Sequence, residues 1–139
     1  MKELSIIDAE KQGIKMKNHM MDNGEKRFRL VQDCGSSYIC TITAEASGWQ
    51  NSHYHLEKKE FYLLESGCAY VAELIHQQLQ ITQLKLDEVY SIKKGNPHNI
   101  YLDENSVLHT IKYGTKSEDW HACIELDEMV KIICVKDIK

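Results

Sequence analysis

The chain is 139 residues long, with 42% hydrophobic and 27% charged residues, which is the length and usage of one ordinary globular domain. This composition excludes a disordered chain, a coiled coil and a fibrous repeat. The formal net charge is -4, and the basic residues of the N-terminal part are interspersed along the sequence with acids. We therefore expect no one-signed basic face and no nucleic-acid partner.

The N-terminus and the cysteines indicate the compartment. Charges interrupt the short apolar stretch within Met1–Asp8, which is far shorter than the core of a signal peptide or a membrane span. We expect a soluble, cytoplasmic protein with no membrane partner. The five cysteines include no Cys-x-x-Cys pair, so neither a disulfide framework nor a thiolate zinc site is indicated. Most of them are expected to be reduced and half-buried.

The segment before about residue 24 is mostly polar, with a short helical turn favoured at Ile6–Lys11. Asn23-Gly24 marks a turn, after which short strands rich in β-branched and aromatic residues are predicted between polar or glycine turns. Their near-regular spacing indicates an all-β sandwich or barrel. The predicted strands are 26–31, 38–44, 52–56, 60–65, 68–74, 79–86, 89–92, 98–102 and 107–113.

Two features concern the later part of the chain. In Leu79–Leu86 the apolar positions change phase, which predicts a β-bulge near Thr82 and Gln83. Further on, acids followed by lysines predict a short C-terminal helix that begins near Leu126 and packs outside the barrel. With no repeat or linker in the sequence, the expected organisation is one domain over 1–139, a barrel core over about 26–114 and a helical tail over about 118–139.

The run from His53 to Glu60 is the part of the sequence that indicates chemistry. Successive side chains of a strand point to opposite faces, so His53 and His55 lie on one face with Cα atoms about 6 to 7 Å apart and can chelate one ion. Residues 56–59 form a polar turn in this interpretation. If the flanking strands pair as an antiparallel hairpin, Glu60 lies beside the two imidazoles. Imidazoles and a carboxylate with open positions are the usual arrangement of a catalytic divalent site.

His98 is a fourth candidate ligand. A Gly-Asn-Pro turn places it at the head of another predicted strand, where Ile100 and Leu102 share its face. These apolar neighbours predict an internal, dry site, in which an ion and its ligands interact strongly.

The first of these segments resembles the first motif of the cupin superfamily, G-x5-H-x-H-x(3,4)-E-x6-G. The match is His53-x-His55-x4-Glu60-x6-Gly67. The opening glycine is displaced by one position, to Gly48.

The second segment is similar to the second cupin motif, G-x5-P-x-G-x2-H-x3-N, with matches at Gly95 and His98. The resemblance covers about residues 37–113. Three positions depart from the second motif, none of them a ligand position: Asp87, Lys93 and Leu102.

The resemblance implies a cupin-type jelly-roll β-barrel with a metal site of three His and one Glu. The implied ligands of one divalent ion, which is iron, manganese, nickel, zinc or cobalt, are His53, His55, Glu60 and His98. It also implies a homodimer in many cases. It implies no single function, because cupins include dioxygenases, isomerases and epimerases, decarboxylases, lyases, storage proteins and sugar-sensing modules.

Three further residues are candidates for the lining of the cavity. Tyr62 shares the parity of Glu60, and Asn51 shares that of His53. His109 lies in a strand that looks apolar on both faces. Packing in the core is the competing interpretation for Tyr62, and a hydrogen-bonded core position is the competing one for His109.

Residues outside the motifs receive structural interpretations. Trp49 is expected to hold a loop in place. Asp119 and Trp120 are expected to anchor the final helix onto the barrel. The acids over 118–128 are interpreted as a solvated face and a helix N-terminus.

The sequence therefore predicts a metalloenzyme that acts on a small polar organic molecule inside the barrel, with the ion as a Lewis acid or, in an iron form, as an oxygen-binding centre. Sugar or sugar-phosphate isomerisation or epimerisation is one alternative. Its phosphorylated form is disfavoured, because phosphates are held by Arg, Lys or a helix N-terminus and only Lys93 and Lys94 lie near the predicted mouth. A second alternative is a non-catalytic module that binds or senses a metabolite.

Overall fold

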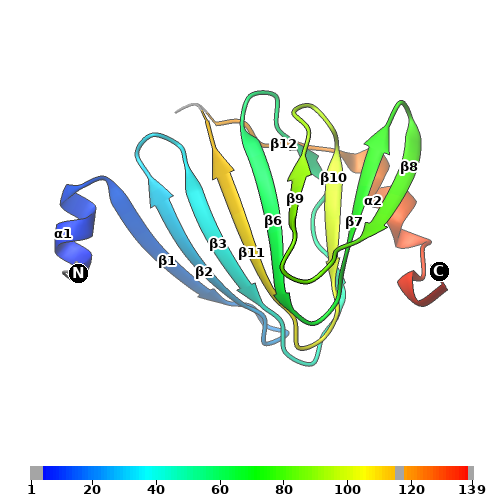
Figure 1. Cartoon of the computed structure of the whole chain (residues 1–139), viewed down its shortest axis with the longest axis horizontal. Helices are drawn as coiled ribbons and strands as arrows, with labels where there is room; N and C mark the ends of the chain where they lie inside the picture. The colour runs from blue at the N-terminus through cyan, green and yellow to red at the C-terminus, as the bar shows by residue number, and fades with distance from the viewer. Residues whose placement is uncertain (1–4, 115–117, 138–139) are drawn as a thin grey trace.

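The computed structural model describes residues 5–114 and 118–137, and its strands form two sheets that face each other (Figure 1). Sheet A has the strand order β1-β2-β3-β11-β6-β9. Sheet B has the order β12-β5-β10-β7-β8, and β4 pairs with β10 at its side. Every strand pair within the described residues is antiparallel. The fold is all-β with the two-sheet architecture of a jelly roll, as the sequence predicts.

The strands predicted from Lys26 onward are all present, although the segment predicted at 52–56 contains only a two-residue strand. β1, β4 and β12 are additional to the prediction. The elements are α1 Ile6–Lys11, β1 Ile14–Met20, β2 Lys26–Gln32, β3 Ser37–Ile42, β4 Gly48–Trp49, β5 His53–Tyr54, β6 Lys59–Ser66, β7 Ala69–Ile75, β8 Gln78–Gln83, β9 Val89–Ile92, β10 His98–Leu102, β11 Val107–Tyr113, β12 His121–Ala122, α2 Ile124–Lys131 and the 3-10 turn Val135–Asp137.

Alternating burial along β6 shows how the two sheets enclose a core. Glu60, Tyr62 and Leu64 are buried, whereas the residues between them are more exposed. The period of two places every second side chain in the interior. One apolar cluster fills this interior: Tyr62, Leu64, Ala69, Val71, Leu84, Ile92, Ile100, Leu102 and Leu108.

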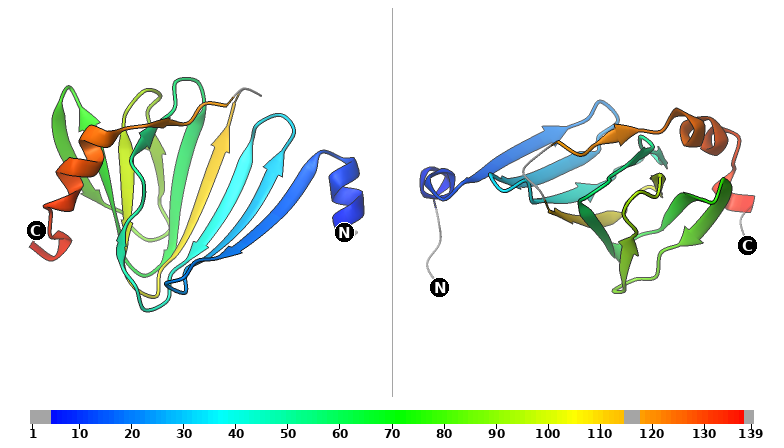
Figure 2. Two further views of the ribbon diagram at one scale, coloured as in Figure 1. Left: turned by 180° about the vertical axis from the view of Figure 1, so that it is seen from behind. Right: turned by 90° about the horizontal axis from the view of Figure 1, so that it is seen from above.

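Helix α2 packs on the outer face of sheet B (Figure 2). Leu126 and Val130 are buried against Ala72 of β7. The prediction of a short helix outside the barrel is confirmed, although the helix begins at Ile124. No helix in the described part of the chain is both long and apolar enough to cross a membrane.

The predicted β-bulge near Thr82 and Gln83 is wrong. β8 pairs with β7 in unbroken register over its whole length. Leu79 and Ile81 pack with α2 on the outer face of sheet B, whereas Leu84 lies in the barrel core just past the end of β8. The apolar pattern changes phase because α2 covers Leu79 and Ile81 from outside whereas Leu84 enters the barrel core, so no inserted residue is needed.

The strand β1 corrects the prediction that the chain before residue 24 contains only a helical turn and polar sequence. The helical turn is present as α1, and β1 then pairs with β2 along its whole length and extends sheet A beyond the barrel (Figure 2). After Ile14 every residue of β1 is exposed. Ile14, Met16 and Met20 alternate with Lys15, Lys17 and His19, so the period of two typical of a strand is present in the sequence, although the structure buries almost none of these residues.

The two glycines of the motifs stand at turns whose positive φ favours glycine. Gly67 has φ +88°, and a Cβ at this position would lie 2.2 Å from the Oγ of Ser106. Gly95 has φ +81° in the turn that leads to His98. Glycine adopts this left-handed conformation without steric cost, so both turns place their following strands without strain.

Candidate metal centre

The four predicted ligands meet inside the barrel. His53 belongs to β5 and His55 follows it directly, while Glu60 lies on β6 and His98 on β10. One ligand atom from each residue lies within 4.8 Å of all the others. His55, Glu60 and His98 are buried, and His53 is half-buried.

The route by which these residues meet differs from the expected hairpin. β5 pairs with β10 and β12 in sheet B, whereas β6 pairs with β11 and β9 in sheet A. His98 is the register partner of His53 on the neighbouring strand. Glu60 instead approaches the imidazoles from the opposite sheet. The turn over 56–58 therefore crosses from one sheet to the other and does not close a hairpin.

The Nε2 atoms of the three histidines face one oxygen of Glu60. The Oε2 atom is 2.7 Å from His98, 2.9 Å from His55 and 3.6 Å from His53. The contact with His98 has hydrogen-bond geometry, but the Nε2 atoms of His53 and His55 are buried without a hydrogen-bond partner. Buried polar atoms left in this way are rare and destabilising. A cation with ligand distances of about 2.0 to 2.2 Å satisfies all four groups, so the residues fit a divalent metal ion.

The other nitrogen of each ring is held by a backbone carbonyl. Because a carbonyl oxygen only accepts hydrogen bonds, each Nδ1 carries a proton, and the lone pair of each Nε2 would be the one offered to a metal ion at the centre of the cluster. This is the tautomer that a metal-binding imidazole needs. The pairs are His53 with Asn51 at 2.9 Å, His98 with Asn96 at 2.9 Å, and His55 with Asp119.

The electrostatics of the site favour an ionised Glu60 carboxylate. Burial alone would raise the pKa of Glu60, but the three imidazoles and the Lys112 ammonium outweigh it and hold this pKa well below its ordinary value. Burial lowers the pKa of His53, against the attraction of Glu60. Metal ions bind deprotonated ligands, so both shifts favour metal binding.

Lys112 is a cation of the site that the sequence interpretation missed. Its Nζ lies 3.9 Å from Oε1 of Glu60. The imidazoles face the other carboxylate oxygen, Oε2. β11 and β6 pair so that Lys112 lies opposite Glu60 and Thr110 opposite Tyr62. Alternate residues of a strand point to the same face, and Leu108 and Thr110 of β11 are buried inside. Lys112, two residues after Thr110, therefore also points inward.

Two aromatic residues border the cluster. Tyr62 is buried with its ring centre 6.3 Å from that of His98, and burial together with the Glu60 carboxylate raises its pKa well above the ordinary value. Trp120 stacks on the ring of His53 with a centroid distance of 5.4 Å. Tyr62 thus keeps its proton, and Trp120 covers the half-buried side of the cluster.

Two of the candidate cavity residues do not point into the barrel. The side chain of Asn51 is exposed, and its backbone oxygen is the part that contacts His53. His109 lies on the outer face of sheet A, where its ring bonds to the hydroxyl of Tyr38 and to Glu65. Its neighbours on β11, Leu108 and Thr110, point inward, so the half-buried His109 points outward and lies outside the cavity.

Asp119 anchors the segment before the final helix onto the barrel, in line with the sequence interpretation, and it does so at the turn that follows His55. Its carboxylate is buried and accepts hydrogen bonds of 2.7 to 2.8 Å from the backbone N–H groups of residues 56–58. Burial would raise its pKa, but these N–H groups and His121 outweigh burial and lower it. Asp119 thus holds the turn between His55 and Glu60, and its own carbonyl orients His55.

The final helix is attached by other groups. The Oδ1 atom of Asp127 accepts a hydrogen bond of 2.8 Å from the backbone N–H of Ser52, next to the first ligand. Trp49 packs in the cluster under α2, with its ring centre 5.5 Å from that of Tyr101. The acids after residue 118 are therefore partly structural, and Trp49 packs beneath the final helix.

Comparison with known proteins identifies the fold. Neither the family models nor the curated proteins contain a match to this chain. Among solved structures, oxalate decarboxylase from Bacillus subtilis matches with a TM-score of 0.62 and 13% identity over 88% of this chain. An uncharacterised protein with a double-stranded β-helix domain from Klebsiella pneumoniae matches with a TM-score of 0.60 and 14% identity over 76% of this chain.

These likenesses establish that the chain has the cupin fold, in agreement with the motif resemblance. The chain spans 36% of the length of the oxalate decarboxylase chain and 84% of that of the Klebsiella protein. At such low identity the comparison concerns the fold alone, and activity has to be argued from the site.

Replacing Asp119 by Ala tests whether its carboxylate organises the metal ligands. We expect Asp119→Ala to lower the free energy of unfolding by about 2 to 3 kcal/mol, because three N–H groups lose a charged acceptor. It should also weaken metal binding by about tenfold or more, since residues that orient metal ligands have effects of this size. Urea unfolding and metal titration measure the two effects.

Glu57→Ala is the matched control, since it removes an exposed carboxylate from the same turn and leaves the backbone bond to Asp119 in place. It should change stability by less than about 0.5 kcal/mol. Equal behaviour of the two variants would contradict the role given to Asp119.

Proposed function

We propose that the protein binds one divalent metal ion through His53, His55, Glu60 and His98 and is an enzyme acting on a small polar organic molecule inside the barrel. The observation that carries this proposal is the anchoring of all three Nδ1 atoms, which leaves three lone pairs and one carboxylate oxygen converging on one point. A set of three imidazoles and one carboxylate suits iron, manganese, nickel, zinc or cobalt.

Such an ion, when bound, supplies a Lewis acid or, as iron, a centre for oxygen chemistry. The chain's own residues define what a ligand meets there. Lys112 presents a positive charge beside Glu60, and the protonated hydroxyl of Tyr62 is a potential donor. Trp120 and the apolar interior limit the access of water, which strengthens each polar contact with the ligand.

The structural neighbours support manganese as the first ion to test. Oxalate decarboxylase from Bacillus subtilis contains Mn(II) centres. Its reaction is not transferred with the fold, because the likeness is one of backbone arrangement at 12% identity.

Tryptophan fluorescence measures metal binding directly. Adding Mn²⁺ or Co²⁺ to metal-free protein should quench the emission of Trp120, because its ring stacks on the ligand His53. The quench should persist in Trp49→Phe and disappear in Trp120→Phe; these are the two tryptophans of the chain. His55→Ala should abolish it in the wild-type background. Equal, negligible metal in untagged wild-type protein and in His53→Ala/His55→Ala, measured by elemental analysis, would refute the metal site.

A turnover assay separates an enzyme from a non-catalytic binding module. Protein loaded with each of the five metals is incubated with a panel of sugars, sugar phosphates, diols and keto acids. We expect turnover of at least one compound, lost in Glu60→Gln because that change removes the anionic ligand. Tight binding of one compound without turnover under any metal would establish the binding module instead.

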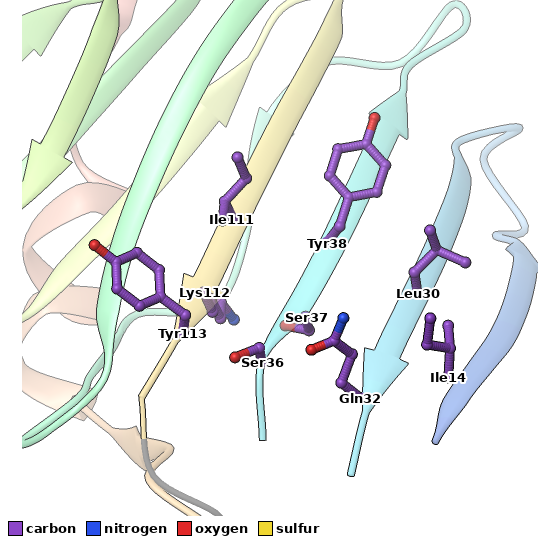
Figure 3. A pocket seen from close by; sticks show the side chains of 9 residues that line it. All are labelled: Ile14, Leu30, Gln32, Ser36, Ser37, Tyr38, Ile111, Lys112 and Tyr113. Carbon is purple, nitrogen blue, oxygen red and sulfur yellow. The ribbon is translucent and has the colours of Figure 1, made fainter. Parts of the chain in front are cut away.

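We also propose that the protein is a homodimer, because the outer face of sheet A is apolar. Figure 3 shows Tyr38, Ile111 and Tyr113 on this face, around a hollow of about 270 Å³ that Ile14 and Leu30 also line. Exposed apolar patches of this kind mark interaction sites, and a twofold axis lets the same face of two copies cover each other.

The dimer is tested by placing a charge on that face. Ile111→Lys should convert a dimer to a monomer in light scattering coupled to size exclusion, because it buries an unpaired ammonium at the interface. Ile124→Lys changes an exposed isoleucine on α2 and should stay dimeric. Wild-type protein that remains monomeric at high micromolar concentration would contradict the proposal.

A further inference from the structure

β1 and β2 carry a basic surface that the linear sequence conceals. In their register Lys17 lies directly opposite Arg29, and His19 lies opposite Arg27. Lys15 shares this face, because it is two residues before Lys17 on the same strand. The other face of the two strands carries apolar and neutral residues, including Met16, Asn18, Met20, Phe28 and Leu30. The expectation that the chain has no one-signed basic face is therefore wrong.

The acids that alternate with these cations in the sequence lie on other elements. Glu25 is the exception, since its Oε2 atom is 3.1 Å from Nη2 and 3.2 Å from Nε of Arg27. Within the described residues, Lys15, Lys17 and Arg29 have no carboxylate at ion-pair distance. The displaced acids are Asp8 and Glu10 in α1 and Asp22 in the turn after β1.

The positive charges of Lys15, Lys17 and Arg29 repel each other because they lie on one face of the sheet. Like charges directly opposite on a cross-strand pair destabilise it. The Nη1 atom of Arg29 donates a hydrogen bond of 2.8 Å to Nδ1 of His19, which is a neutral acceptor and leaves the charge of Arg29 uncompensated. An anion bound on this face offsets the repulsion between Lys17 and Arg29.

The basic surface lies on the same face of sheet A as Glu60. β2 is three strands from β6 and β1 is four, which at a strand spacing of about 4.8 Å is about 14 Å and about 19 Å. Lys112 lies on this face beside Glu60. Arg27 also lines a hollow of about 270 Å³ with Asn51, whose carbonyl orients His53. The register row that connects the two regions is Lys17, Arg29, Ile39, Thr110 and Tyr62.

We propose that Lys15, Lys17, Arg27 and Arg29, called here the β1–β2 basic surface, bind the phosphate group of a small phosphorylated molecule whose other end reaches the metal centre. Guanidinium groups match phosphate oxygens with two parallel hydrogen bonds, and lysines add point charges. That the other end of the molecule reaches the metal centre rests on the proposed function, whereas phosphate binding by the β1–β2 basic surface does not. The phosphorylated substrates that the sequence disfavoured thus become the class that the structure favours.

A nucleic acid fits this surface less well than a small molecule. The chain as a whole carries a net charge of -4, which repels a long polyanion. The hydrophobic residues on this face of β1, β2 and β3 are the aliphatic Val31 and Ile39, so these strands provide no Phe, Tyr or Trp ring on which a base could stack.

Calorimetric titration of metal-free protein with inorganic pyrophosphate at low salt tests the surface. We expect binding that is weakened about tenfold or more in Lys17→Gln/Arg29→Gln, since two charge-assisted contacts are lost. Lys11→Gln/Lys26→Gln removes the same charge from exposed positions elsewhere and should stay within about twofold of wild type. Lys15→Gln/Lys17→Gln, at exposed positions, is a second variant that leaves the half-buried arginines in place.

Further arms separate this proposal from its rivals and from the metal site. His55→Ala should bind pyrophosphate like wild type, so loss of the metal site and loss of the basic surface give different results. Succinate should bind about tenfold more weakly than pyrophosphate, because a carboxylate carries less charge than a phosphate. No pyrophosphate binding, equal weakening in the control variant, equal affinity for succinate, or tighter binding of a single-stranded oligonucleotide would each overturn the proposal.

Discussion

The structure depends on the convergence of three imidazoles from one sheet on a single carboxylate from the other. Glu60 reaches His53, His55 and His98 across the interior, so the polar cluster joins the two sheets beside the apolar core. Burial of these groups is costly unless they are paired. Their pairing depends on backbone carbonyls that fix the far side of every ring.

Support for this cluster comes from segments that are distant in sequence. Asp119 holds the turn over 56–58 with three backbone hydrogen bonds, and its carbonyl orients His55. Asp127 binds the backbone of Ser52, just before the first ligand. The C-terminal part of the chain thus sets the geometry of ligands near the middle of the sequence. Precise placement of this kind is what separates a functional metal site from a loose group of ligand residues.

The two faces of sheet A differ in chemical character. The inner face carries Glu60 and Lys112 in the barrel and the β1–β2 basic surface beyond it, whereas the outer face is apolar around Ile111 and Tyr113. Successive residues of these strands point to opposite faces of sheet A. The same strands therefore present a charged face suited to an anionic ligand and an apolar face suited to a second copy of the chain. Helix α2 covers the outer face of sheet B, so the exposed apolar face belongs to sheet A.

The sequence by itself determined the fold class and the four residues of the candidate site, because period-two patterns, turn glycines and the spacing of His53, His55 and Glu60 are local properties. It did not reveal that Glu60 faces the histidines from the opposite sheet, that Lys112 joins them, or that Asp119 holds their turn. Strand pairing decides these contacts, and pairing depends on packing between segments far apart in the chain. Strand pairing likewise places Lys17 of β1 opposite Arg29 and His19 opposite Arg27 of β2, which the linear sequence does not reveal.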